Sequence, residues 1–125
     1  MPDKTAIATF RRVLTSADVL AAREERQAAA KVADGCSIDH LQPRTRCRAT
    51  GVLRSVVFRP RSDTQALEAD LYDGSGSLAL VWLGRRAIGG IEPGRRLIVE
   101  GMVSVNNTRL TMFNPRYELL PGVGA

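Results

Sequence analysis

The spacing of apolar residues changes at about residue 43 and divides the chain into two parts. In the first part, apolar side chains recur at intervals of three and four residues, at Ile7, Phe10, Leu14, Ala17 and Ala21. This spacing places them on one face of a helix, and it predicts helical structure over residues 5–34 with Gly35 as the C-terminal stop. The sequence Thr15-Ser16-Ala17-Asp18 is typical of a helix N-cap, so the segment can form one helix or two.

After residue 43 the period becomes two, which is typical of half-buried strands. Five strands are predicted, over residues 46–58, 67–72, 78–83, 96–105 and 108–113. Asp73-Gly74-Ser75-Gly76 forms a tight turn after the second strand, and Asn106-Asn107 forms another after the fourth. Gly51 and Gly101 lie inside the two long strands, where glycine allows a strand to coil sharply. The pattern therefore predicts a small closed barrel.

The order of these motifs resembles an OB-fold. A glycine-bent strand is followed by a strand running into Asp-Gly-Ser-Gly, an apolar strand ending in Trp-Leu-Gly, a Pro-Gly before Leu-Ile-Val-Glu-Gly, and an Asn-Pro. From Arg44 to about Leu120 the chain is similar to small actinobacterial OB-fold nucleic-acid-binding domain proteins. It is more distantly similar to the wedge domain of branched-DNA helicases and to anticodon-binding OB domains. The resemblance implies a mainly β fold, a five-stranded Greek-key barrel preceded by one or two α-helices.

The expected organisation has three parts. Residues 1–43 form a helical segment packed on the barrel, residues 44–121 form the barrel, and residues 122–125 form a flexible tail. Many OB domains close one barrel end with a helix between the third and fourth strands, but residues 85–93 have room for only about two helical turns. We therefore expect the N-terminal helix to close that end with Ile7, Phe10 and Leu14 pointing inward. The weakly amphipathic stretch after Ala21 is free to project from the body.

The charge distribution favours a polyanionic partner for the second part of the chain. The formal net charge is +5, with six basic and six acidic residues before residue 44 and twelve arginines against seven acidic residues after it. The longest apolar run, Leu78–Leu83, is too short to cross a bilayer, and the N-terminus carries no secretion signal. We expect a cytoplasmic protein with no membrane partner.

The cysteine and histidine content points away from metals and cofactors. Cys36 and Cys47 lie outside any Cys-x-x-Cys motif, and His40 is the one histidine, so no zinc ligand set is present. The cysteines are expected to be reduced thiols, and we expect neither a metal nor a cofactor. With His40 as the one histidine, no serine or cysteine nucleophile has an evident histidine partner. We therefore also expect no enzymatic activity.

A repeated Gly-Arg-Arg unit, at residues 84–86 and 94–96, has two interpretations. It could grip phosphate, or its glycines could be turn residues. Gly94 follows Pro93, the arrangement of a type II turn whose third position requires a positive φ. Gly89-Gly90 and Gly74-x-Gly76 match neither a P-loop nor a dinucleotide-binding pattern. We therefore interpret the glycines as structural, and the four arginines as solvated positive charges at the barrel edge.

The outer face of the second and third strands is where OB domains usually bind single strands. If Leu67, Ala69 and Leu71 point inward, then Glu68, Asp70 and Tyr72 point outward, and Trp82 belongs to the core. The two acids would repel phosphate unless Arg48 and Arg54 offset them, and cross-strand ion pairs among these groups are the structural alternative. Phe113 can be outward or buried against the first strand, and Tyr117 can seal the barrel end.

These observations predict a non-catalytic OB-fold protein that binds single-stranded or branched nucleic acid, DNA or RNA, through a basic rim. The alternative is a protein–protein interaction or adaptor module that uses the barrel and the N-terminal helix. The candidate nucleic-acid-binding residues are Arg48, Arg54, Arg59, Arg61, Tyr72, Arg85, Arg86, Arg95, Arg96, Arg109 and Arg116.

Overall fold

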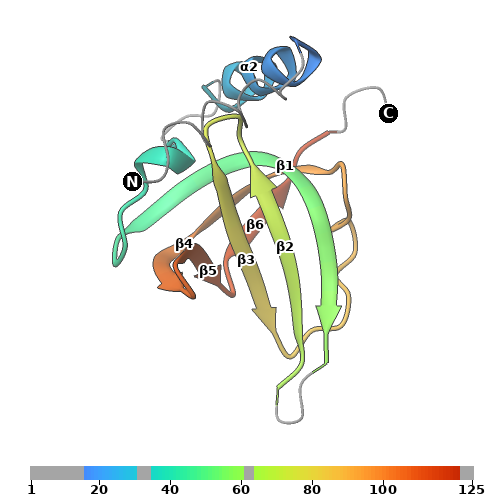
Figure 1. Cartoon of the computed structure of the whole chain (residues 1–125). Helices are drawn as coiled ribbons and strands as arrows, with labels where there is room; N and C mark the ends of the chain where they lie inside the picture. Colours follow the sequence, from blue (N-terminus) through green and yellow to red (C-terminus); the bar gives the residue numbers. More distant parts are fainter. Residues whose placement is uncertain (1–15, 31–34, 61–63, 122–125) are drawn as a thin grey trace, which may run out of the picture.

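A computed structural model of the chain describes residues 16–30, 35–60 and 64–121 (Figure 1). One α-helix, α2 (Ser16–Ala30), precedes a short 3-10 helix, η1 (Ile38–His40). Six strands follow: β1 (Arg46–Arg59), β2 (Ala66–Tyr72), β3 (Ser77–Leu83), β4 (Arg96–Asn106), β5 (Arg109–Phe113) and β6 (Arg116–Leu119). The helix predicted over residues 5–34 is confirmed over the described residues Ser16–Ala30.

Five of the six strands form a ring. The order is β1-β2-β3-β5-β4, and pairing of β1 with β4 closes the ring. All pairs are antiparallel except β3 with β5, which run parallel. The predicted mainly β fold with a small barrel is thereby confirmed. The sixth strand, β6, was not predicted: it pairs with the free edge of β4, where Leu97 faces Leu119.

β1 serves both sides of the ring because it bends in its middle. Residues 46–52 pair with β4, and residues 52–59 pair with β2. Gly51 lies at the crossing point, where a β-carbon would collide with the carbonyl oxygen of Tyr72. A β-bulge between Leu53 and Ser55 then shifts the register by one residue. The predicted bend at Gly51 is therefore confirmed.

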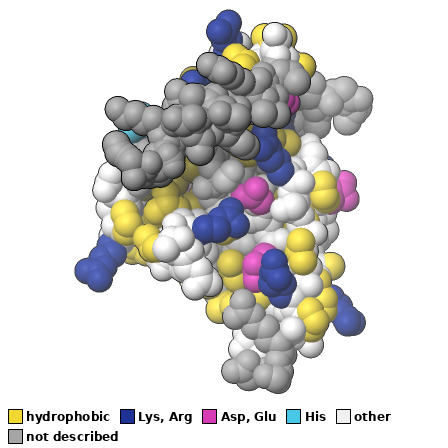
Figure 2. Space-filling model, in the orientation of Figure 1, with side chains coloured by type: hydrophobic (Ala, Val, Ile, Leu, Met, Phe, Trp, Pro, Cys, Tyr) yellow, Lys and Arg dark blue, Asp and Glu magenta, His cyan; other side chains and the backbone are white. Residues whose placement is uncertain are grey.

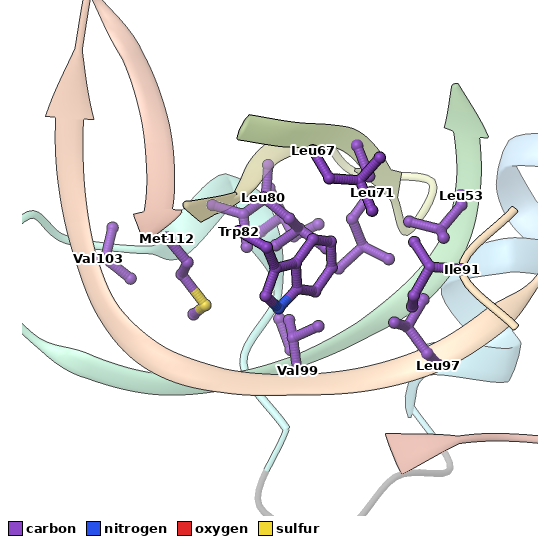
Figure 3. Packing of buried hydrophobic residues seen from close by; sticks show 14 of the residues in the cluster. Leu53, Leu67, Leu71, Leu80, Trp82, Ile91, Leu97, Val99, Val103 and Met112 are labelled. Carbon is purple, nitrogen blue, oxygen red and sulfur yellow. The ribbon is translucent and has the colours of Figure 1, made fainter. Parts of the chain in front are cut away.

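The interior of the ring holds the core, with Trp82 at its centre (Figure 3). Ile38 and Leu41, which lie just before β1, are buried in this core. Ile88 and Ile91, in the connection between β3 and β4, are buried in it as well. That connection contains turns instead of a helix, one of them closed by a hydrogen bond from the Ile91 N–H to the Ile88 carbonyl oxygen (3.0 Å).

α2 lies against the barrel and is attached to it mainly through polar contacts. None of its side chains is buried. The Glu25 carboxylate pairs with Arg96 of β4, and the Arg26 Nε donates a hydrogen bond to the Gly74 carbonyl oxygen (2.9 Å). The stretch after Ala21 therefore packs on the barrel instead of projecting from it. The expected plug residues Ile7, Phe10 and Leu14 lie outside the described residues.

The Asp73 carboxylate joins η1 to the turn between β2 and β3. It is almost fully buried and accepts hydrogen bonds from the Ile38 N–H (2.9 Å), the Ser75 N–H (2.9 Å), the Ser75 hydroxyl (2.6 Å) and the Gly76 N–H (3.1 Å). Asp73 therefore caps the tight turn that the sequence predicts at residues 73–76.

We predict that Asp73→Ala lowers the free energy of unfolding by about 3 kcal/mol, because buried donors lose a charged acceptor. Urea denaturation measures this change. Asp73→Asn retains one acceptor oxygen and is expected to lose less. Equal losses in the two variants would contradict the assignment of the stability to these hydrogen bonds.

Gly94 has a φ of 90° and occupies the third position of a turn closed by a hydrogen bond from the Arg95 N–H to the Glu92 carbonyl oxygen (3.2 Å). Gly84, in the first Gly-Arg-Arg unit, has a φ of 74°. Both glycines are therefore turn residues, as the sequence predicts.

We predict that Gly94→Ala lowers the free energy of unfolding by about 1 kcal/mol, because an L-residue is strained at this φ. No atom would obstruct the added methyl group, so the backbone angle is the one cost. Gly89→Ala is the matched control, since Gly89 faces equally open space and has no positive φ. If urea denaturation finds the same loss in both variants, strain at Gly94 is not the cause.

Candidate nucleic-acid interface

The candidate interface is the outer face of β2, β3 and β5. Alternation along β2 turns Leu67, Ala69 and Leu71 into the core and leaves Glu68 and Asp70 on the outside, as predicted. The strand registers then set Glu68 beside Val81 of β3, and Val81 beside Phe113 of β5. One row across the three strands therefore consists of an acid, an aliphatic side chain and an aromatic ring.

This face is hollowed between two loop regions. A depression of about 320 Å³ is lined by Arg59, Glu68, Ala79, Val81, Asn106, Asn107, Arg109 and Thr111. A second depression of about 180 Å³ shares Glu68, Val81 and Asn106 with the first and extends to Leu83 and Phe113. Together they form one surface feature, which we call the groove. Its floor is partly apolar, and its sides are the end of β1 and the hairpin between β4 and β5.

The two acids in the groove are paired with arginines from its sides. The Arg59 Nε lies 3.0 Å from a Glu68 carboxylate oxygen, and the Arg109 Nη2 lies 2.9 Å from an Asp70 carboxylate oxygen. Figure 2 shows basic and acidic side chains interspersed on the β2–β3 side, without a continuous basic patch. Ion pairs between strands, the alternative that the sequence offered, therefore form at both acids, with Arg59 of β1 and Arg109 of β5 as the cations.

These ion pairs leave hydrogen-bonding capacity at the groove. The Arg59 and Arg109 side chains are more than half exposed. A guanidinium has five N–H donors, and each of these pairs uses few of them. The remaining donors are available to a phosphate, whereas the opposite charges cancel within the groove. Charge alone therefore gives this surface little attraction for a polyanion at a distance.

Phe113 is the aromatic side chain that the groove presents to solvent, with 42% of its surface exposed. Its outward direction settles the alternative left open by the sequence. The alternation of side chains along β5 already predicts this direction, because Phe113 must face the side opposite to its buried neighbour Met112. Tyr72, which was predicted as a binding residue, lies under the Arg54 guanidinium, 3.3 Å from the ring centre to the Arg54 Cζ.

The four arginines of the Gly-Arg-Arg units differ from one another. Arg85 and Arg86 are exposed, and the Arg86 guanidinium lies 5.1 Å from the centre of the Phe58 ring. Arg95 and Arg96 are half-buried. Arg96 forms a two-pronged ion pair with Glu25, with N–O distances of 2.5 and 2.6 Å. The expectation of four solvated charges is therefore confirmed for Arg85 and Arg86 but wrong for Arg95 and Arg96, and at Arg96 the reason is the ion pair with α2.

Arg48 and Arg116 lie away from the groove, on the outer face of β1, β4 and β6. Both are register neighbours of Glu100, and with Tyr117 they line a shallow hollow of about 120 Å³. The Tyr117 ring also contacts Trp82 edge-on, with ring centres 5.9 Å apart. The predicted rim is thus divided between two faces, and Arg61 lies outside the described residues.

Two further features bear on the class of site. Among the described residues, no group of histidine, cysteine, aspartate and glutamate side chains could hold a metal ion. In the same part of the chain, no helix has the length and apolar character that a membrane span requires.

Comparison with known proteins supports the fold. No protein-family model matches the chain, and none of the curated proteins matches it in sequence. Among solved structures, the chain is similar to part of RecG in its structure bound to a three-way DNA junction, with a TM-score of 0.56 and 22% sequence identity. The match covers 70% of this chain but 12% of the RecG chain. At this identity the likeness establishes a shared fold.

Proposed function

We propose that this chain is a non-catalytic nucleic-acid-binding protein that holds a single strand, or the unpaired part of a branched nucleic acid, in the groove. The observation that carries the proposal is the exposed Phe113 ring on a partly apolar floor between Arg59 and Arg109. The shared fold with a part of RecG, which was solved with a DNA junction, supports nucleic acid as the class of ligand.

In this proposal the bases and the backbone use different parts of the groove. A base stacks on Phe113, a contact that every base can make and that typically contributes about 1–3 kcal/mol. Phosphates accept hydrogen bonds from the free N–H groups of Arg59 and Arg109. Glu68 and Asp70 hold both guanidiniums in place, and they also weaken binding by repelling phosphate.

One observation favours a different partner. The charges of Arg59 and Arg109 are cancelled by Glu68 and Asp70, and Leu83 is exposed at the end of the groove. A neutral, partly apolar groove also suits a peptide segment of another protein. A protein-interaction module is therefore the second candidate, and the response to charge substitutions separates the two.

We predict that Phe113→Ala weakens binding of a labelled single-stranded oligonucleotide by about tenfold or more, because a stacked base loses its platform. Fluorescence anisotropy measures the dissociation constant. Tyr117→Ala is the matched control, since Tyr117 is an aromatic residue of similar exposure outside the groove. Equal affinity of the parent and Phe113→Ala would exclude stacking at this site.

We predict opposite effects from removing the two kinds of charge in the groove. The variant Glu68→Gln/Asp70→Asn should bind several-fold more tightly, because phosphate no longer competes with carboxylate for the guanidiniums. The variant Arg59→Ala/Arg109→Ala should bind more weakly, and its log–log salt slope should be shallower by roughly 0.7 for each lost phosphate contact. Anisotropy titrations at several salt concentrations measure both effects.

Arg48→Ala/Arg116→Ala removes the same charge outside the groove and controls for net charge. If this control loses as much affinity as the groove variant, the binding is non-specific. If the parent does not bind DNA or RNA at low salt, the protein-interaction candidate takes precedence.

A further inference from the structure

The chain has two cysteines, and the fold brings them close together although ten residues separate them. The Cys36 N–H donates a hydrogen bond to the carbonyl oxygen of Arg48, the residue after Cys47 (2.7 Å). Desolvation, followed by the Cys47 side chain, raises the pKa of Cys36, which is consistent with two thiols that lie within interaction distance. The backbone hydrogen bond to Arg48 therefore sets the two cysteines side by side, and it holds the segment before β1 against the strand at this point.

The two thiols differ in their surroundings. Cys47 is half-buried, packs against the core, and lies 3.5 Å from the Thr45 hydroxyl through its Sγ. Cys36 is exposed and borders a hollow of about 170 Å³ that Ser37, Asp73 and the end of α2 also line. A small oxidant can therefore reach Cys36, while Cys47 is placed to react with it from the core side.

We propose that Cys36 and Cys47 are a disulfide-forming site that an oxidant of the peroxide class closes within one chain. Cys36 attacks the peroxide, the O–O bond breaks, and a sulfenic acid and one water molecule form. The Cys47 sulfur then attacks the Cys36 sulfur, the S–O bond breaks, and a second water molecule leaves with the Cys47 proton. The two thiols lose two electrons in total, and these reduce the peroxide to water.

The low reactivity of the Cys36 thiol indicates a structural disulfide instead of a catalytic cysteine. Desolvation and the neighbouring Cys47 side chain raise the pKa of Cys36, so this group is a neutral thiol near neutral pH. Since the thiolate is the reactive form, oxidation is expected to be slow under these conditions. Such a pair forms a bond that persists, and a thiol reductant is needed to reopen it.

The bond would secure one end of the barrel core. Between the two cysteines lie Ile38 and Leu41, which are buried in the core, and the η1 segment that Asp73 caps. A disulfide closing this loop restricts the unfolded chain while leaving the native contacts in place. The oxidised protein should therefore be more stable than the reduced protein. The inference does not depend on nucleic-acid binding.

The test treats the full-length protein with hydrogen peroxide and compares it with Cys36→Ser and Cys47→Ser. We expect both thiols to disappear together, the intact mass to fall by two hydrogen atoms, and one cross-linked peptide to join residues 36 and 47 in a monomer. The melting temperature should rise by roughly 5–10 °C and return to its starting value with dithiothreitol. Neither serine variant should show this reversible rise.

Three outcomes would overturn the proposal. One is a disulfide-linked dimer through Cys36. Another is oxidation of Cys36 to a sulfinic acid while Cys47 remains a thiol. The third is an intramolecular bond that leaves the melting temperature unchanged, which would show that the loop is not locked. The double variant Cys36→Ser/Cys47→Ser is treated in the same way as a control. It lacks both thiols but keeps the methionines, so any change that peroxide still causes in its mass or melting temperature comes from methionine oxidation.

Discussion

The ring of strands depends on how β5 is joined to β3 at Asn114 and Pro115. The two strands pair in parallel over three residues of each, the shortest ladder in the ring. Beyond it, the Asn114 N–H donates to the Val81 carbonyl oxygen (2.6 Å), and the Asn114 side-chain oxygen accepts from the Leu83 N–H (2.9 Å). The Trp82 indole N–H donates to the Pro115 carbonyl oxygen (3.1 Å). Asn114 has a φ of 52°, which asparagine tolerates better than most residues, and this angle turns the chain out of β5.

This junction connects the core to the proposed binding surface. The same tryptophan that fills the barrel satisfies its one polar group at the junction, so core packing and ring closure reinforce each other. Because the junction fixes the position of β5, it sets Phe113 beside Val81 on the outer face. It also places the β4–β5 hairpin, and with it Arg109, within reach of Asp70. The groove is therefore a consequence of how the ring closes.

Much of the fold could be predicted because it follows from local pattern. The period of two located β1 to β5, glycine marked the bend at Gly51 and the turn at Gly94, and alternation placed Trp82 inside and Glu68 and Asp70 outside. β6 escaped prediction because a four-residue strand after a proline has almost no period, and its partner is an edge of β4 that only the folded ring exposes.

The site was less predictable because its contacts join residues far apart in the sequence. Arg109 reaches Asp70 over 39 residues, and Arg96 reaches Glu25 over 71. The sequence shows that arginines are abundant, but the arrangement of the strands in the ring determines which of them form ion pairs, are covered or face solvent. The proximity of Cys36 and Cys47 was missed for the same reason, since a search for Cys-x-x-Cys spacing finds no motif when the fold brings the two segments together.

The most direct test of the central claim is to map where a nucleic acid contacts the protein. Two-dimensional ¹H–¹⁵N NMR spectra of the labelled protein, recorded during titration with a short single-stranded oligonucleotide, provide that map. We expect the largest shifts at Arg59, Glu68, Val81, Arg109 and Phe113, with little change in β6. Shifts concentrated around Arg48 and Arg116, or spread evenly over all exposed arginines, would contradict the assignment of the groove as the binding surface.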